Sequence, residues 1–117
     1  MELFIDTTLA EGGVIVLSFR GQAGSEYLDR FKERLESVIQ DPSKKYLFLF
    51  KDLSYINSLA LGAFAASIKK IIKGGGSAAM AELSTSVREI FSMTRLEKAL
   101  NIYNSKEDAL KALNVSS

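Results

Sequence analysis

One short stretch, in which an apolar strand runs through a polar loop into an amphipathic helix, constrains the fold more than any other. Residues 46–50 form a continuous apolar run, which is typical of a central strand covered on both faces. Residues 52–62 follow, and an alanine-rich helix continues to about Lys73. In open α/β sheets, partners bind at the carboxyl ends of strands, and a helix N-terminus adds unpaired N–H groups. We therefore expect any functional site here.

The rest of the chain alternates strands with helices. Residues 3–10 and 14–19 read as two strands joined by a glycine turn, which predicts an antiparallel hairpin. Gly21 and Gly24 lie in the segment that ends the second strand. Ser25 caps the first helix, which ends near Pro42. The glycines at 74–76 end the second helix. The predicted order is β-β-α-β-α-β-α-β-α in a single domain, residues 1–117. The expected α/β fold is a mixed, mostly parallel sheet of four to five strands, with about four helices.

Composition excludes several classes of function. The 117-residue chain has no cysteine and no histidine, which removes thiol chemistry, the commonest general base and the commonest transition-metal ligand. A net charge of +1 gives no field for binding nucleic acid. The chain shows neither a signal-peptide pattern nor an apolar run long enough to cross a membrane. We expect a soluble, cytoplasmic, non-enzymatic protein without a cofactor, a metal or direct membrane insertion.

The element order and the central stretch together resemble the STAS domain, the fold of bacterial anti-sigma factor antagonists. The family's central pattern reads Asp-Leu-Ser, two variable residues, then Asp-Ser-Ser-Gly-Leu-Gly. This chain matches its beginning with Asp52, Leu53 and Ser54, and its end with Leu61 and Gly62. Between them, Asn57 stands at the acidic position, Ser58 at the first serine, Leu59 at the second and Ala60 at the first glycine. Residues 91–96 and 100–103 resemble the family's passage into its last strand.

The resemblance implies a partner-switching regulator of transcription. In the family, the antagonist binds an anti-sigma factor that is also a serine kinase-like ATPase, and phosphorylation of the second serine releases it. A phosphate breaks such a contact because it adds about two negative charges. Here Leu59 has no hydroxyl, Asn57 has no carboxylate, and Gly24 replaces a further family acid in the 21–24 loop. The usual switch is therefore expected to be lost or moved to Ser58.

The predicted partner-binding residues all belong to the central stretch, and three of them have alternative roles. Ser58 could accept phosphate or cap the second helix, and we favour the cap. Asn57 could contact a partner or cap the same helix. Leu59 is core by the usual preference of leucine, but exposed if it stands where the family has its serine. The full predicted set is Asp52, Tyr55, Asn57, Ser58, Leu59, Leu61 and Gly62.

Three functions are compatible with this sequence to different degrees. The first is a non-catalytic binding module that docks through residues 52–62 and the following helix onto a kinase-like anti-sigma factor, as a monomer or weak dimer. The alternative is an architectural STAS subunit of a larger signalling or lipid-transport assembly. An enzyme with Ser58 as nucleophile is disfavoured because no histidine is present to act as base.

Overall fold

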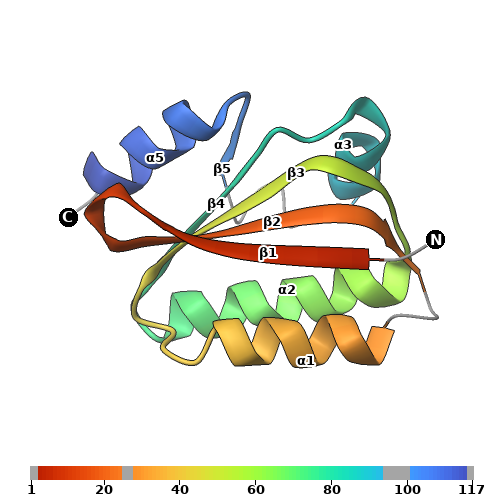
Figure 1. The fold of residues 1–117 in the computed structure, drawn as a ribbon, viewed down its shortest axis with the longest axis horizontal. Helices are drawn as coiled ribbons and strands as arrows, with labels where there is room; N and C mark the ends of the chain where they lie inside the picture. Colours follow the sequence, from red (N-terminus) through yellow and green to blue (C-terminus); the bar gives the residue numbers. More distant parts are fainter. Residues whose placement is uncertain (1–2, 25–27, 94–100, 116–117) are drawn as a thin grey trace.

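Five strands form one mixed sheet in the order β1-β2-β3-β4-β5 in the computed structural model, which describes residues 3–24, 28–93 and 101–115 (Figure 1). β1 pairs antiparallel with β2 across the short 3₁₀ turn η1 (Glu11–Gly13), and the remaining neighbours pair in parallel. Both Gly12 and Gly13 adopt a positive φ there, which the tight hairpin turn requires. The strands are β1 (Leu3–Ala10), β2 (Val14–Ala23), β3 (Lys45–Ile56), β4 (Ser77–Ala81) and β5 (Asn101–Tyr103).

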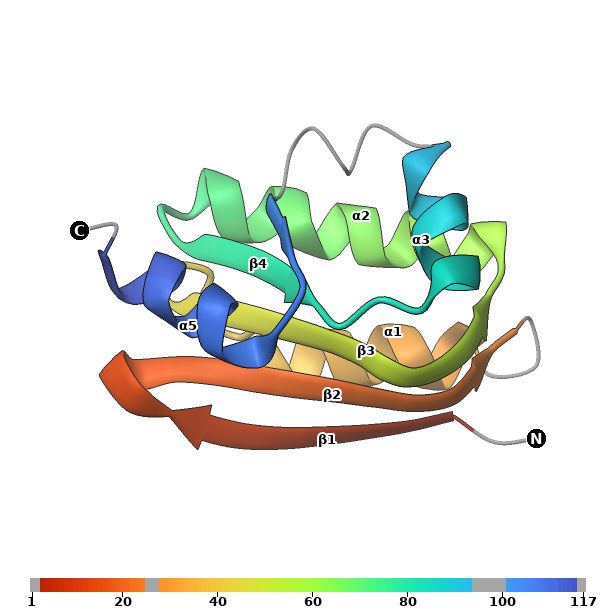
Figure 2. The same cartoon turned by 90° about the horizontal axis from the view of Figure 1, so that it is seen from above.

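Helices cover both faces of this sheet, as parallel strands require. Two long helices, α1 (Leu28–Val38) and α2 (Ser58–Lys73), lie side by side on one face (Figures 1 and 2). α5 (Lys106–Val115) covers part of the opposite face, and α3 (Thr85–Ser92) follows β4 near the far end of β3. The predicted α/β class, antiparallel hairpin and element order are confirmed, with five strands and four helices among the described residues. Ser25, the expected cap of the first helix, and residues 95–100 lie outside the described residues.

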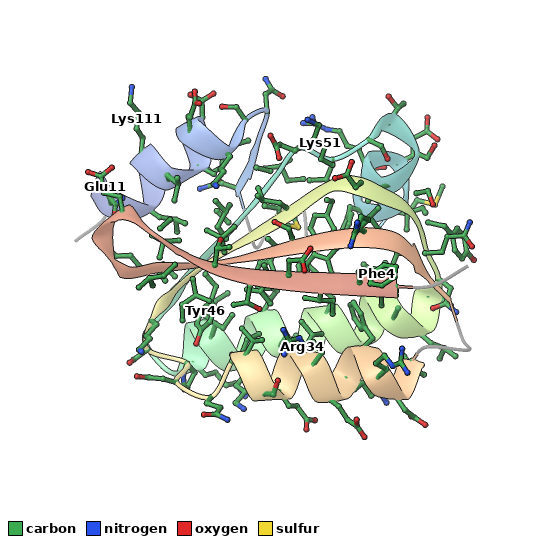
Figure 3. The ribbon with its side chains drawn as sticks, in the orientation of Figure 1. Phe4, Glu11, Arg34, Tyr46, Lys51 and Lys111 are labelled. Atoms are coloured by element: carbon green, nitrogen blue, oxygen red, sulfur yellow. The ribbon has the colours of Figure 1, made fainter. Side chains whose placement is uncertain are left out.

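The central strand β3 separates two apolar cores. The larger core lies between the sheet and helices α1 and α2, where Phe48 and Phe64 meet edge to face with ring centroids 4.8 Å apart. The smaller core lies under α5 and includes Leu47, Leu49 and Leu113. Alternate residues of the 46–50 run therefore enter opposite cores, which explains why the run is continuously apolar. In Figure 3, Tyr46 lies on the α1 and α2 side and Lys51 on the α5 side.

Strands β2 and β3 extend further than the sequence pattern predicts. We expected β2 to end at Phe19 and β3 at Phe50, but they continue to Ala23 and Ile56 and remain paired. Their register shifts between Ser18 and Arg20 and again beyond Gly21. Such irregularities are β-bulges, which insert an extra residue and hide the two-residue period of a strand. The segment expected to be a loop is therefore a bulged strand that leads directly into α2.

Candidate functional site

The bulges of β3 expose consecutive side chains on the approach to α2. Phe50, Leu53 and Ile56 are buried in the larger core at a spacing of three residues. A regular strand would bury every second residue, so each bulge leaves two consecutive residues outside. Lys51 and Asp52 form the first exposed pair, and Ser54 and Tyr55 form the second.

Contacts with β2 fix the second exposed pair in place. The Ser54 hydroxyl donates a hydrogen bond to the carbonyl of Gly21 at 3.0 Å, which ties the end of β3 to its neighbour. Tyr55 remains 47 % exposed beside it. The aromatic ring therefore projects from a backbone that is held on one side by strand pairing. A rigidly mounted, exposed tyrosine is a typical anchor for protein–protein contacts.

Asn57 is the N-cap of α2. Its backbone is extended, and its side-chain oxygen accepts a hydrogen bond from the backbone N–H of Ala60 at 2.8 Å. This confirms the capping alternative for Asn57. The cap that we favoured at Ser58 is wrong, because Ser58 is the first residue of the helix itself and its side chain is exposed. The helix therefore begins one residue earlier than a cap at Ser58 would require.

Leu59 is an exposed apolar side chain in the first turn of α2. It is 57 % exposed, so the core interpretation is wrong and the exposed alternative holds. The prediction for Leu61 also needs correction, because its side chain is 7 % exposed and packs into the larger core. Gly62 is exposed, and a Cβ built on it would meet nothing within 4 Å. Helical periodicity explains the contrast, because only one side of the turn faces the sheet.

The predicted site residues therefore divide into a surface and its support. Asp52, Tyr55, Ser58, Leu59 and Gly62 are exposed along the end of β3 and the start of α2, which we call the β3–α2 surface. Asn57 caps the start of α2 within this surface, and Leu61 packs beneath the surface in the larger core. Sequence reasoning missed Ser54 as the tie to β2. The three-residue spacing of buried side chains after Phe50 was the signal that could have revealed the bulged strand.

The β3–α2 surface carries both polar and apolar groups, among them Asp52, Tyr55 and Leu59. Across residues 3–24, 28–93 and 101–115, no group of three or more histidine, cysteine or carboxylate side chains could hold a metal ion. In the same ranges, no helix combines the length and the apolar character needed to span a membrane.

Comparison with known proteins identifies the family. The model of the STAS domain matches residues 7–109, and the chain belongs to this family. An anti-sigma F factor antagonist from Paenibacillus polymyxa is 26 % identical over 106 residues, which are 90 % of this chain and 91 % of the relative. The chain is thus a STAS-domain protein that is similar to an anti-sigma factor antagonist.

Two solved structures show how closely the fold is shared. An anti-sigma factor antagonist from Mycobacterium paratuberculosis superposes with a TM-score of 0.84 at 21 % identity, covering 96 % of this chain and 94 % of the other. An anti-sigma-factor antagonist domain protein from Planctomyces limnophilus gives a TM-score of 0.83 at 20 % identity, covering 93 % and 96 %. At such low identity the fold is conserved while most side chains differ.

Proposed function

We propose that this protein is a cytoplasmic anti-sigma factor antagonist that docks through its β3–α2 surface onto a kinase-like anti-sigma factor. The observation that carries the proposal is the exposure of Leu59, at 57 %, in the first turn of a helix whose start is fixed by a cap. Tyr55, 47 % exposed, lies on the strand that leads into the same turn. Exposed apolar side chains at a rigid junction favour a protein partner.

Leucine at this position changes how such a contact is regulated. A partner kinase cannot phosphorylate Leu59, because its side chain has no hydroxyl. The leucine instead offers apolar area that a contact buries, at about 25 cal/mol per Å². The antagonist would then remain bound in the presence of ATP. Ser58, exposed beside it, carries a hydroxyl through which phosphate could weaken the contact.

The docking test compares two apolar residues of one helix. Affinity capture with the intact chain first isolates the anti-sigma factor, and titration calorimetry then measures its affinity. Leu59→Asp should weaken binding by more than about 1 kcal/mol, because a charge enters the contact. Ile72→Asp is the matched control, since Ile72 is 49 % exposed near the opposite end of α2. Equal effects of the two variants, or no effect of Leu59→Asp, would remove Leu59 from the contact.

The regulatory test restores the family's acceptor. The complex is incubated with ATP, and phosphorylation of the antagonist is measured by mass spectrometry. We expect the native chain to stay bound and Leu59→Ser to become phosphorylated and dissociate. Dissociation of the native chain with phosphate on Ser58, abolished in Ser58→Ala, would instead place the switch one residue earlier. If capture yields a stable multi-subunit transport or signalling assembly, the architectural alternative replaces the antagonist.

A further inference from the structure

The outer edge of β1 is a second surface, distinct from the β3–α2 surface. β1 keeps an unbroken eight-residue register with β2, from Leu3 to Ala10, and contains neither glycine nor proline. Among the described residues, no strand pairs with its other side (Figure 2). Such an edge presents a row of N–H and C=O groups that another strand can pair with. The opposite edge, β5, is three residues long.

The side chains of β1 do little to protect this edge. Natural edges usually carry lysines, prolines or bulges that prevent further pairing. β1 carries a single charge, Asp6, while Phe4 is 44 % exposed and Leu9 is 76 % exposed. One side chain from α1 reaches this edge, because Arg34 Nη2 lies 3.5 Å from the carbonyl oxygen of Ile5. A single long contact of this kind is weak.

We propose that β1 pairs antiparallel with β1 of a second copy of this chain, joining two sheets into one. A two-fold axis perpendicular to the sheet pairs residues that lie on the same face, and charge then selects the register. A pair centred on Asp6 would place two carboxylates opposite each other, which is unfavourable. A pair centred on Thr7 places Asp6 opposite Thr8 and Ile5 opposite Leu9 of the second copy. The second register combines polar with polar and apolar with apolar side chains.

A groove lies beside β1, next to the proposed contact. It has a volume of about 400 Å³, and its lining includes Leu9, Ile15, Arg34 and Val38. Leu9 and Ile5 lie on the α1 side of the sheet, so the paired side chains would cover this groove. β2 separates β1 from β3, so pairing through β1 leaves the β3–α2 surface outside the new contact. A single strand pair is a small interface, and the dimer is therefore weak.

Sedimentation equilibrium of the intact chain over a range of concentrations tests the association. We expect a reversible dimer. Leu9→Lys should raise its dissociation constant about tenfold, because two equivalent Ile5–Leu9 pairs are lost. Ile72→Lys, on α2, should leave it unchanged. A monomer at every concentration, or equal effects of both variants, overturns the proposal. The proposal is also overturned if the protein stays monomeric and its β1 edge instead binds an added extended peptide of unrelated sequence.

Cross-linking tests the register independently, because the native chain has no cysteine. A short thiol-reactive cross-linker is added to Thr7→Cys, to Thr8→Cys and to Lys111→Cys, whose position on α5 is exposed. All three variants keep Asp6. Thr7→Cys should form covalent dimers fastest, and Lys111→Cys should form almost none. Equal yields at positions 7 and 111, or a higher yield at position 8, overturn the pairing centred on Thr7. Thermal melting of each variant establishes that the strand still folds.

Discussion

The two ends of α2 are built in opposite ways. The N-terminal end is open, with Leu59 exposed and space around Gly62. The C-terminal end is closed, because Gly76 lies against the turn that precedes β3. A Cβ on Gly76 would come within 2.2 Å of the carbonyl oxygen of Pro42 and 2.4 Å of that of Lys44. Packing therefore requires a glycine at position 76, whereas position 62 has room for a side chain.

Polar contacts reinforce the closed end. The buried Tyr46 hydroxyl donates to the carbonyl of Asp41 at 2.6 Å, and burial raises the pKa of Tyr46. The backbone N–H and the hydroxyl of Ser43 both donate hydrogen bonds to the Asp41 carboxylate, and these bonds lower its pKa. The same bonds hold the turn that precedes β3. Close packing and polar contacts thus both restrict the C-terminal end of α2. At the open end, Asn57 caps the helix, and the side chains of Ser58 and Leu59 are exposed.

The largest expected effect is that of Gly76→Ala. Both close atoms belong to the backbone and cannot rotate away, so we expect a loss of about 3 kcal/mol in the free energy of unfolding. Urea denaturation followed by circular dichroism measures it. An unchanged midpoint would show that the 42–44 turn shifts freely, and the closed end would then be no more constrained than the open one.

Asn57→Ala should have the next largest effect. It removes the acceptor for the Ala60 N–H and should cost about 1 kcal/mol of stability. Asn57→Asp keeps an acceptor oxygen and adds a charge that suits the helix N-terminus, so it should retain stability. Comparing the two denaturation midpoints separates the loss of the cap from a general sensitivity of the junction. Equal losses in both variants would contradict the capping role.

The C-terminal end of α2 at its glycines and the element order could be predicted from the sequence because their signals are local. The continuous apolar run at 46–50, the glycines at 74–76 and the amphipathic spacing of α2 each specify a structure by a short-range rule. The start of α3 illustrates the same point. The sequence offers Ser84 or Thr85 as its cap, and in the structure Ser84 is the cap and accepts a hydrogen bond from Val87 N at 3.3 Å. Local signals of this kind can be read from the sequence without knowledge of the tertiary contacts.

The open end was harder to predict because its structure depends on non-local pairing. The strand continues to Ile56 only because β2 continues beside it with matching register shifts. Extending the strand sets the helix start, which makes Asn57 the cap in place of Ser58. It also sets which side of the first turn faces the sheet, so that Leu61 is buried and Leu59 is exposed. A preference scale for single residues contains none of this information.

Gly62→Ala should change the free energy of unfolding in the opposite direction from Gly76→Ala, and it therefore tests the contrast between the two ends of α2. Gly62 lies inside a helix with open space around it, so alanine should raise stability by about 0.5–1 kcal/mol. If the partner backbone approaches this position closely, the same variant should weaken partner binding. Denaturation and calorimetry on one preparation give both numbers. A gain in stability with unchanged affinity would remove Gly62 from the proposed contact.

Ser58→Ala should have the smallest effect on stability, within about 0.5 kcal/mol of zero. Its side chain is exposed, and the cap is supplied by Asn57, so alanine removes no hydrogen bond that holds the helix start. The informative quantity is the difference from Asn57→Ala, which we expect to be about 1 kcal/mol in the same denaturation assay. If both variants lose equal stability, the serine shares the capping role and its hydroxyl is less available for phosphate. If Ser58→Ala is neutral, any effect of the variant on partner release with ATP reports on regulation alone, because the helix start is unchanged.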